Sequence, residues 1–324
     1  MKIFVTGANG FVGRHTCTHL LDRGHDVTAG VRTAGSAPLG TEECLVGDLG
    51  PASDWNKDLS GHDAIVHLAA RVHVMNDTAK DPLAEFRRVN TFGTVALAQA
   101  ASSQGVPRFV FLSSIKVNGE KTDGRPFTAK DSPDPQDSYG VSKHEAEVAL
   151  RSVERETDLQ VVVVRTPLVY GPGVGGNFVK TLSLARSGIP LPLRSLRNSR
   201  TLCSVWNLVE LLEKCASDEA AAGALVLAGD LTSPSTGGLV REISRAMGKR
   251  SRNFSFPPAL LGLAGRATGK SAIIRRLTQS LEVTAGSSST AFTWHPSERF
   301  EDSIKRTVDW YLGDVAAPDS SSRI

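Results

Sequence analysis

Two residues near the middle of the chain, Tyr139 and Lys143, have the types and spacing of an acid–base pair. On a helix, side chains four positions apart lie on one face. An ammonium beside a phenol stabilises the phenolate, so we expect Lys143 to draw the pKa of Tyr139 from about 10 towards neutrality. Tyr139 would then exchange a proton with an alcohol while hydride moves at the adjacent carbon. Ser114, at the expected end of a buried strand, would hold the substrate oxygen and stabilise developing charge.

A glycine-rich stretch close to the N-terminus predicts a site for a dinucleotide pyrophosphate. Its glycines recur as G-x-x-G-x-x-G, between an apolar run and an amphipathic one. Glycines allow a tight turn and close backbone approach, and the free N–H groups at the start of a helix attract phosphate. The pattern departs from the G-x-G-x-x-G of other dinucleotide folds, and a purely structural turn is the alternative. The candidate cofactor contacts in this stretch are Gly7, Asn9, Gly10, Phe11, Val12 and Gly13.

Arg32 stands where the second expected strand ends, a place at which an acidic residue would favour NAD. No carboxylate is present there, so Arg32, helped by Arg14, is expected to pair with the 2′-phosphate of NADP. We therefore favour NADP(H), with NAD(H) as the alternative. Asp48, followed by Leu49 as a further cofactor contact, is placed to accept a hydrogen bond from the adenine amino group. The alternatives are a surface arginine without this role and a carboxylate that caps a turn.

The first half of the chain alternates short apolar runs with longer amphipathic stretches, which predicts a doubly wound parallel α/β sheet. Several runs are continuously apolar, as expected of strands covered by helices on both faces. Helices are expected at 11–23, at 81–104 with Asp81 as N-cap and Pro82 as first residue, and at 138–155. Strands are expected at 2–6, 26–31, 43–46, 64–68, 108–112 and 160–164.

After Arg165 the prolines and glycines are expected to break up regular structure over roughly 25 residues. Beyond them, 205–216 is an expected helix and 224–227 a strand that returns to the sheet. We therefore expect a Rossmann-type dinucleotide-binding domain over 1–170, to which 202–232 returns. The remaining segments, 171–201 and 233–315, would form a smaller, mostly helical substrate-binding lobe, with a frayed tail at 316–324.

The composition excludes several classes of protein. The chain has 324 residues, with 37 Lys and Arg against 34 Asp and Glu and a net charge of +3. No basic run stands out, so no nucleic-acid partner is expected. The apolar runs fall short of the roughly 20 residues of a membrane span, and the N-terminus shows no secretory signal. The four cysteines lie far apart without metal-ligand spacing, which favours a reducing cytoplasm and predicts no metal site.

These motifs together resemble the extended short-chain dehydrogenase/reductases, in the epimerase/dehydratase branch that acts on nucleotide sugars. The resemblance covers nearly the whole chain and is carried by TGANGFVG (6–13), GDL (47–49), HLAA (67–70), VN..GT (89–94), FLSSIKVNG (111–119), YGVSK (139–143) and RTPLVYGPG (165–173). It implies that Ser114, Tyr139 and Lys143 form the catalytic triad. It also implies that Asn90 is a structural polar residue near the nicotinamide, or one that bonds a neighbouring turn. Further cofactor contacts that it implies are Leu68, Ala69, Ala70, Tyr139, Lys143, Pro167 and Val169.

The same resemblance implies a site for a UDP-sugar. Asn177 and Arg200 would contact the diphosphate, although each is an ordinary loop residue when taken alone. His73 could face the substrate, but exposure or packing is the favoured role for it. Relatives also imply a homodimer that pairs the helices at 81–104 and 138–155. The full set of implied substrate contacts is Arg71, Ser114, Lys116, Tyr139, Asn177 and Arg200.

Three reactions share this machinery: 4-epimerisation, 4,6-dehydration and reduction of a 4-keto sugar. Dehydrating relatives carry acidic residues after the catalytic serine, and 115–118 holds no carboxylate, so dehydration is not expected. Asn118 replaces the tyrosine and Pro167 the asparagine of many epimerases, and an exchangeable NADP(H) favours a reductase. The stretches 67–77, 111–120 and 167–178 are similar to a bacterial polysaccharide subgroup that reduces UDP-2-acetamido-2,6-dideoxy-hexos-4-ulose to UDP-N-acetylquinovosamine.

This reduction is the predicted activity, and three alternatives stay open. The first is a 4-epimerase of UDP-glucose or UDP-N-acetylglucosamine. The second, of another class, is a non-catalytic NADP-binding sensor or scaffold, against which the intact Ser114, Tyr139 and Lys143 argue. The third is an enzyme for a steroid or another hydrophobic ketone, against which Asn177 and Arg200 argue.

Overall fold

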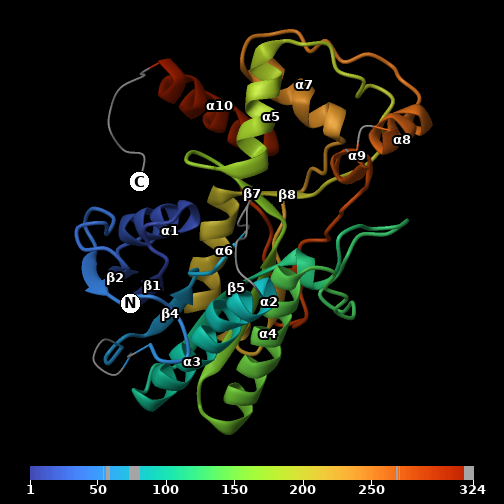
Figure 1. The fold of residues 1–324 in the computed structure, drawn as a ribbon. Helices are drawn as coiled ribbons and strands as arrows, with labels where there is room; N and C mark the ends of the chain where they lie inside the picture. Colours follow the sequence, from blue (N-terminus) through green and yellow to red (C-terminus); the bar gives the residue numbers. More distant parts are fainter. Residues whose placement is uncertain (54, 56–58, 73–80, 268, 270, 317–324) are drawn as a thin grey trace.

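The computed structural model describes residues 1–53, 55, 59–72, 81–267, 269 and 271–316, and it is built around an eight-stranded sheet (Figure 1). The strands lie in the order β10-β9-β6-β5-β4-β1-β2-β3. All neighbouring pairs are parallel except β9 and β10. The strands are β1 (Lys2–Thr6), β2 (Asp26–Val31), β3 (Glu42–Leu45), β4 (Ala64–His67), β5 (Arg108–Ser114), β6 (Gln160–Thr166), β9 (Leu225–Leu227) and β10 (Gly286–Ser287).

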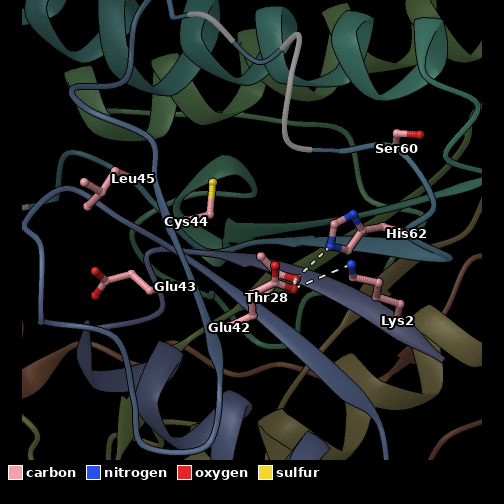
Figure 2. A pocket seen from close by; sticks show the side chains of 8 residues that line it. All are labelled: Lys2, Thr28, Glu42, Glu43, Cys44, Leu45, Ser60 and His62. Carbon is pink, nitrogen blue, oxygen red and sulfur yellow. Dashed lines mark hydrogen bonds and ion pairs between the residues drawn. The ribbon is translucent and has the colours of Figure 1, made fainter.

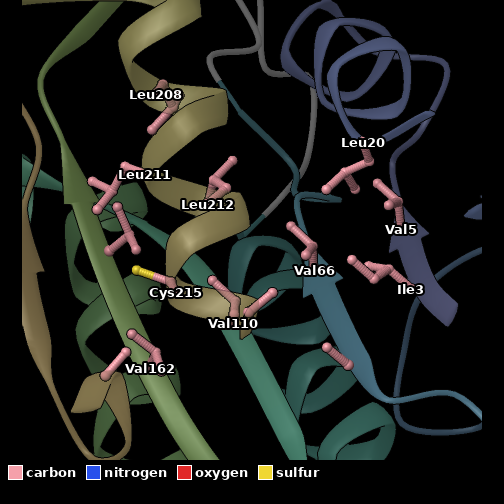
Figure 3. Close-up of a cluster of buried hydrophobic side chains, with 14 of the residues drawn as sticks. Ile3, Val5, Leu20, Val66, Val110, Val162, Leu208, Leu211, Leu212 and Cys215 are labelled. Atoms are coloured by element: carbon pink, nitrogen blue, oxygen red, sulfur yellow. The ribbon is translucent and has the colours of Figure 1, made fainter. Parts of the chain in front are cut away.

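Helices cover both faces of this sheet, which confirms the doubly wound arrangement. On one face α1 (Phe11–Asp22) and α6 (Val205–Ser217) bury their leucines and cysteines against β1, β4, β5 and β6 (Figure 3). On the other face α3 (Gly93–Ser103) and α4 (Ser138–Glu156) pack against the alternate residues of the same strands. Ile3 and Val5 point into the first cluster and Phe4 into the second, as the two-residue period of a strand requires.

The helix expected at 81–104 contains a π-helical turn that the sequence pattern does not announce. It consists of α2 (Pro82–Phe86), the π-helix η1 (Arg87–Phe92) and α3. Asp81 is the N-cap as predicted, and its carboxylate accepts a hydrogen bond of 3.1 Å from the backbone N–H of Ala84. A π-turn inserts one residue into the helical repeat and often marks a functional site.

The second half forms a mostly helical body beside the carboxyl ends of the strands. Its own apolar cluster includes Tyr170, Phe178, Leu193, Ile243 and Ile304. The prediction of irregular structure after Arg165 is wrong for a short strand at Leu168–Tyr170 and for one helix, because Gly175 and Gly176 begin α5 instead of interrupting it. The elements are a two-stranded sheet of β7 (Leu168–Tyr170) and β8 (Leu202–Ser204), with α5 (Gly176–Ser187), α7 (Thr236–Ala246), α8 (Pro258–Ala267), α9 (Ser271–Thr278) and α10 (Phe300–Ala316).

A buried polar network links this body to the sheet. The Tyr170 hydroxyl donates to one carboxylate oxygen of Asp230 at 2.8 Å. The other oxygen accepts from the Ser204 N–H at 2.9 Å and from the Asn207 side chain at 2.7 Å. Asn207 in turn accepts from the backbone N–H of Glu298, just before α10, at 2.9 Å. The strand predicted at 224–227 does rejoin the sheet, as β9 beside β6.

Candidate active site

The glycine-rich turn between β1 and α1 leaves almost no space for side chains. Gly7 has φ +66°, and a Cβ there would lie 2.8 Å from the Ala69 nitrogen. A Cβ on Gly13 would lie 2.1 Å from the Gly7 carbonyl oxygen. Gly10 is the N-cap of α1 and has no side chain to cap the first N–H groups. The turn therefore fits a dinucleotide pyrophosphate at the helix N-terminus.

His67, at the end of β4, is a buried residue that sequence reasoning did not single out. Its Nδ1 is 2.6 Å from the Thr6 hydroxyl, and its Nε2 is 3.0 Å from the Thr94 hydroxyl. Because Thr94 donates its hydrogen to the Asn90 carbonyl, Nε2 must be the protonated nitrogen of a neutral ring. Burial first, and then the charge of Lys143, lowers the pKa of His67 to about 3.

The neutral imidazole accepts from Thr6, whose oxygen accepts from the N–H groups of Leu68 and Ala69 at 3.2 and 3.3 Å. The ends of β1 and β4 are thereby held together beside Gly7. The nitrogen and Cα of Ala69 are the atoms nearest to a Cβ built on Gly7, so backbone atoms close one side of the turn. Two of the three expected contacts at 68–70, Leu68 and Ala69, are thus adjacent to the glycine turn.

Arg32 and Asp48 lie opposite each other at the ends of β2 and β3. Their side chains are 73% and 83% exposed, and the Arg32 Nη1 to Asp48 Oδ1 distance is 3.6 Å. A pair so exposed contributes little to stability, so both side chains are available to a ligand. Asn9 donates to the Ser36 hydroxyl at 3.1 Å and accepts from Arg14 through its backbone oxygen at 3.0 Å. Candidates for the adenosine end of a cofactor therefore share one edge of the sheet.

Tyr139 lies in the first turn of α4, where the Asp137 side chain caps the helix by accepting from the Gly140 N–H at 2.7 Å. Its hydroxyl forms a hydrogen bond with the side chain of Ser114, at the end of β5. The predicted depression of the tyrosine pKa is wrong. Burial raises the pKa of Tyr139 to about 12, and the bond to Ser114 opposes this only in part. The phenol is therefore protonated at neutral pH and can act as a proton donor.

Lys143 is almost completely buried one helical turn after Tyr139. Its Nζ donates to the Leu112 carbonyl oxygen at 2.9 Å and lies 4.4 Å from the centre of the Phe111 ring. Burial lowers the pKa of Lys143 to about 7, while the negative charge of Glu147 opposes this shift. Its amine therefore gains and loses a proton close to neutral pH.

A buried ionic network that sequence reasoning missed lies beneath this pair. The Glu147 carboxylate contacts the Arg165 guanidinium at 2.5 Å and accepts from the Ser113 hydroxyl at 2.5 Å. Arg165 also donates to the side-chain oxygen of Asn118 at 2.9 Å. The sequence holds one signal for Glu147: it follows Lys143 by four residues, so both side chains lie on the same face of the helix. Asn118, noted as a replacement for tyrosine, is a partner of a buried arginine.

Asn90 bonds a neighbouring turn, which was one of its two expected roles. From the π-helix η1 its side chain accepts from the Arg71 N–H at 2.8 Å and donates to the Arg71 oxygen at 3.0 Å. It also donates to the hydroxyl of Ser142 at 3.0 Å. Asn90 therefore fixes the backbone that follows β4 against the helix that carries Tyr139.

Two of the implied substrate contacts, Lys116 and Arg200, are bonded to other groups of the protein. The Lys116 ammonium is paired with Asp137 and with Glu120, the latter at 2.8 Å. Arg200 donates to the backbone oxygens of Arg276 and Gln279 at 3.1 and 3.2 Å. Burial lowers the pKa of Arg200, and the nearby charge of Glu120 opposes this.

Asn177 is exposed in the first turn of α5, where its backbone oxygen accepts from Thr181. Pro167 is buried and Val169 half-buried on β7. His73 lies outside the described residues. Arg276, which sequence reasoning did not select, is an exposed cation near the end of α9, and its backbone oxygen accepts from Arg200.

One pocket lies at the opposite edge of the sheet from these residues (Figure 2). It is lined by the start of β1, by β3 and by the segment before β4, including Lys2, Glu42 and His62. Ligands of doubly wound sheets bind at the carboxyl ends of the strands, where Ser114 and His67 lie. The pocket is therefore separate from the candidate active site.

Among the described residues, no group of three or more His, Cys, Asp and Glu side chains could hold a metal ion. Within the same ranges, no helix has the length and apolar character needed to cross a bilayer.

Known proteins with the same fold and sequence pattern place the chain in a family. The model of the family described as "NAD dependent epimerase/dehydratase family" matches residues 3–224. A Vibrio cholerae protein described as UDP-glucose 4-epimerase is 39% identical over 317 residues, covering 96% of this chain and 95% of that protein. A Haloferax volcanii protein described as low-salt glycan biosynthesis protein Agl12 is 28% identical and covers 97% of this chain and 99% of its own length.

Solved structures agree on the fold. MoeE5 in complex with UDP-glucose and NAD has a TM-score of 0.74 at 23% identity, covering 97% of this chain and 100% of its own. The UDP-glucuronic acid 4-epimerase of Bacillus cereus in complex with NAD has a TM-score of 0.74 at 19% identity, covering 97% and 99%. The chain therefore belongs to the NAD dependent epimerase/dehydratase family of enzymes, a family of extended short-chain dehydrogenase/reductases.

Proposed function

We propose that the protein reduces the C4 keto group of UDP-2-acetamido-2,6-dideoxy-hexos-4-ulose to give UDP-N-acetylquinovosamine, with NADPH as the reductant. The observation that carries the proposal is the hydrogen bond between the hydroxyl of Tyr139 and the side chain of Ser114, at the carboxyl end of β5. A ketone reduction needs such a proton donor at the new alkoxide.

The residues divide the chemistry as follows. The Ser114 hydroxyl donates to the C4 oxygen and stabilises the negative charge that develops there. The Tyr139 hydroxyl gives its proton to that oxygen. Lys143, when protonated, stabilises the phenolate that is left behind. The bound dinucleotide supplies the hydride, and Gly7, Gly10 and Gly13 form the turn that would hold its pyrophosphate.

The proposed preference for NADPH rests on the edge where β2 and β3 end. Arg32 is exposed there, without an acidic residue in its own loop that would repel a 2′-phosphate. Asp48 is close to it and equally open to solvent, as a group that accepts from an adenine amine. The solved relatives named above were determined with NAD, so NADH is the second candidate cofactor.

The second candidate activity is 4-epimerisation of a UDP-hexose. It is favoured by the Vibrio cholerae relative, which matches the chain over nearly its whole length and is described as UDP-glucose 4-epimerase. An epimerase keeps its dinucleotide bound and returns the hydride to the same substrate, so it consumes no cofactor. A reductase releases oxidised cofactor at each turnover.

One pair of incubations separates the two activities. The purified protein is given the 4-keto-6-deoxy sugar nucleotide with NADPH, and separately UDP-N-acetylglucosamine without added cofactor. We expect NADPH oxidation that matches product formation in the first, and no UDP-N-acetylgalactosamine in the second. Interconversion of the two UDP-sugars without consumption of NADPH would replace the reductase by the epimerase.

We further propose a homodimer that works in the cytoplasm. Phe92 on η1 and Val148 on α4 expose 51% and 55% of their surface, and a self-paired interface would remove this apolar area from water. Cys17, Cys203 and Cys215 are buried thiols outside any disulfide, which suits a reducing compartment. Sedimentation velocity should give twice the chain mass, and Phe92→Glu with Val148→Glu should give the monomer. A monomeric wild-type protein would contradict the dimer.

A further inference from the structure

The net charge of +3 conceals a strong separation of charge between parts of the fold. Residues 171–201 and 233–280 together hold 14 Lys and Arg and a single acidic residue, Glu242. The rest of the chain holds 23 Lys and Arg against 33 Asp and Glu. Glu242 is itself paired with Arg245 at 3.6 Å. These two segments of the lobe are therefore strongly cationic, whereas α10 in the same lobe holds four acidic and two basic residues.

The far end of α5 points away from the sheet (Figure 1), and Arg186, Arg250 and Arg252 lie at or beside that end. The helix α5 starts just after β7, and its 12 residues carry the chain about 18 Å outward. At its far end, the Leu191 N–H donates to the Arg252 oxygen and the Phe254 N–H to the Leu191 oxygen, at 3.3 and 2.9 Å. The segment after α7 is thereby fixed beside the end of α5. The residues of this outer surface are Leu184, Arg186, Ile189, Arg250, Arg252 and Phe254.

Apolar and basic side chains alternate on the outer surface. Ile189 is 58% exposed, Phe254 44% and Leu184 37%. A shallow groove is lined by Leu184, Ile189, Arg250 and Arg252. Phe254 lies two residues after Arg252 and is hydrogen-bonded through its backbone to Leu191. The helix α8 begins four residues after Phe254 and exposes Leu260 and Leu263, which lie on one face because they are three positions apart. Exposed apolar side chains that form one contiguous patch with a polar rim mark an interaction site.

We propose that this outer surface docks the enzyme on an anionic lipid bilayer. Arginines would meet lipid phosphates, while the leucine, isoleucine and phenylalanine side chains would enter the boundary between headgroups and acyl chains. Charge alone would also suit a nucleic acid. Phosphate backbones, however, leave exposed aliphatic side chains in water, whereas a bilayer buries them. The surface is remote from Ser114 and Tyr139, so docking leaves the active site open, and the proposal is independent of which sugar is reduced.

The test is co-sedimentation of the full-length protein with lipid vesicles. We expect binding to phosphatidylcholine vesicles that contain about one third phosphatidylglycerol, and none to phosphatidylcholine alone. Raising the salt from about 0.1 M to about 0.5 M should weaken it, because screening shortens the reach of the arginine charges. A protein that stays in the supernatant with the anionic vesicles at low salt would refute the proposal.

Two pairs of substitutions locate the surface. Arg250→Glu with Arg252→Glu should lower the partition coefficient on the order of tenfold or more. Lys130→Glu with Arg155→Glu, at exposed positions of the dinucleotide-binding domain, changes the net charge equally and should leave binding nearly unchanged. Equal losses in both variants would show attraction by net charge only, and would overturn the assignment to this surface.

A third variant tests the apolar part. Ile189→Ser with Phe254→Ser keeps every charge and should still weaken binding several-fold, since less apolar area enters the interface. Unchanged binding would overturn insertion. A fluorescent DNA duplex is the competing ligand: tight binding to DNA with none to anionic vesicles would assign the surface to nucleic acid instead. Melting temperature and turnover of each variant, both expected at the wild-type value, report that the fold is intact.

Discussion

Glu147 lies one helical turn after Lys143 and holds the guanidinium of Arg165 at a shortest N–O distance of 2.5 Å, with both side chains less than a tenth exposed. The pair is completed by the hydroxyl of Ser113 and the side-chain oxygen of Asn118. It therefore joins β5, β6 and α4 one turn of α4 after Lys143. Because the charge of Glu147 also acts on Lys143, the pair links the stability of the fold to the protonation of the site.

Glu147→Gln should lower the free energy of unfolding by about 3–5 kcal/mol, because it leaves the Arg165 charge buried without a counter-charge. Urea denaturation followed by circular dichroism measures this. The matched control is Glu145→Gln on the same helix, whose pair with Arg87 is partly exposed and should contribute at most about 1 kcal/mol. Equal losses in the two variants would mean that burial of the first pair has no special cost.

Tyr139→Phe should lower kcat for ketone reduction by about 10²–10⁴-fold, since it removes the proton donor and little else. The ring contact with Phe86, with centroids 6.1 Å apart, is kept by phenylalanine, so the melting temperature should hardly change. Protection from heat by NADPH should also persist. A variant that turns over at the wild-type rate would remove Tyr139 from the chemistry and favour a non-catalytic, cofactor-binding role for the protein.

The pH profile of reduction should report Lys143. With its pKa lowered to about 7, its amine is charged below that pH and neutral above it, while Tyr139 stays protonated up to about 12. Since a charged Lys143 stabilises the phenolate formed in the reaction, kcat/KM should fall as the pH rises through about 7. Lys143→Arg keeps a permanent charge and should lose this decline, at a lower absolute rate. A profile that rises with pH would indicate a base in place of an acid.

Most of the strands could be predicted closely because they are apolar runs flanked by polar or glycine residues, as β1 and β2 are. The edge strand β10 could not, since Gly286 and Ser287 have no strand-like pattern and pair only through their backbone with β9. The helix α5 was hidden by the glycines before it. The π-turn at 87–92 depends on packing against α4, which a helical repeat does not reveal.

In the site, too, features set by local spacing could be predicted, whereas features set by the packing of the whole fold could not. Tyr139, Lys143 and the glycines have fixed local spacing, and the structure brings Ser114 to Tyr139 as predicted. The direction of the tyrosine pKa shift was missed, because it is decided by burial, which depends on the whole fold. The hydrogen-bond network of His67 and the ionic network of Arg165 could not be predicted either, since the partners of each residue come from other strands and helices.

Arg32→Glu should reverse the cofactor preference. A carboxylate in that place would repel a 2′-phosphate and accept hydrogen bonds from ribose hydroxyls, so KM for NADPH should rise on the order of tenfold or more while KM for NADH falls. Steady-state kinetics with both cofactors measure the ratio. Arg23→Glu, an exposed arginine at the end of α1, is the control for charge alone. An unchanged ratio would remove Arg32 from the cofactor site.

Gly13→Ala tests whether the turn after β1 holds the dinucleotide. The added Cβ would lie 2.1 Å from the Gly7 oxygen and 2.8 Å from the Ala8 backbone, so the turn must shift and the first N–H groups of α1 with it. Thermal protection by NADPH, which wild-type protein should show, is expected to disappear, because protection measures binding to the folded state. Gly262→Ala, in α8 with no atom near the new Cβ, should keep full protection and slightly raise stability, by about 0.5–1 kcal/mol. If Gly13→Ala folds and is still protected as well as the wild type, the pyrophosphate must bind elsewhere.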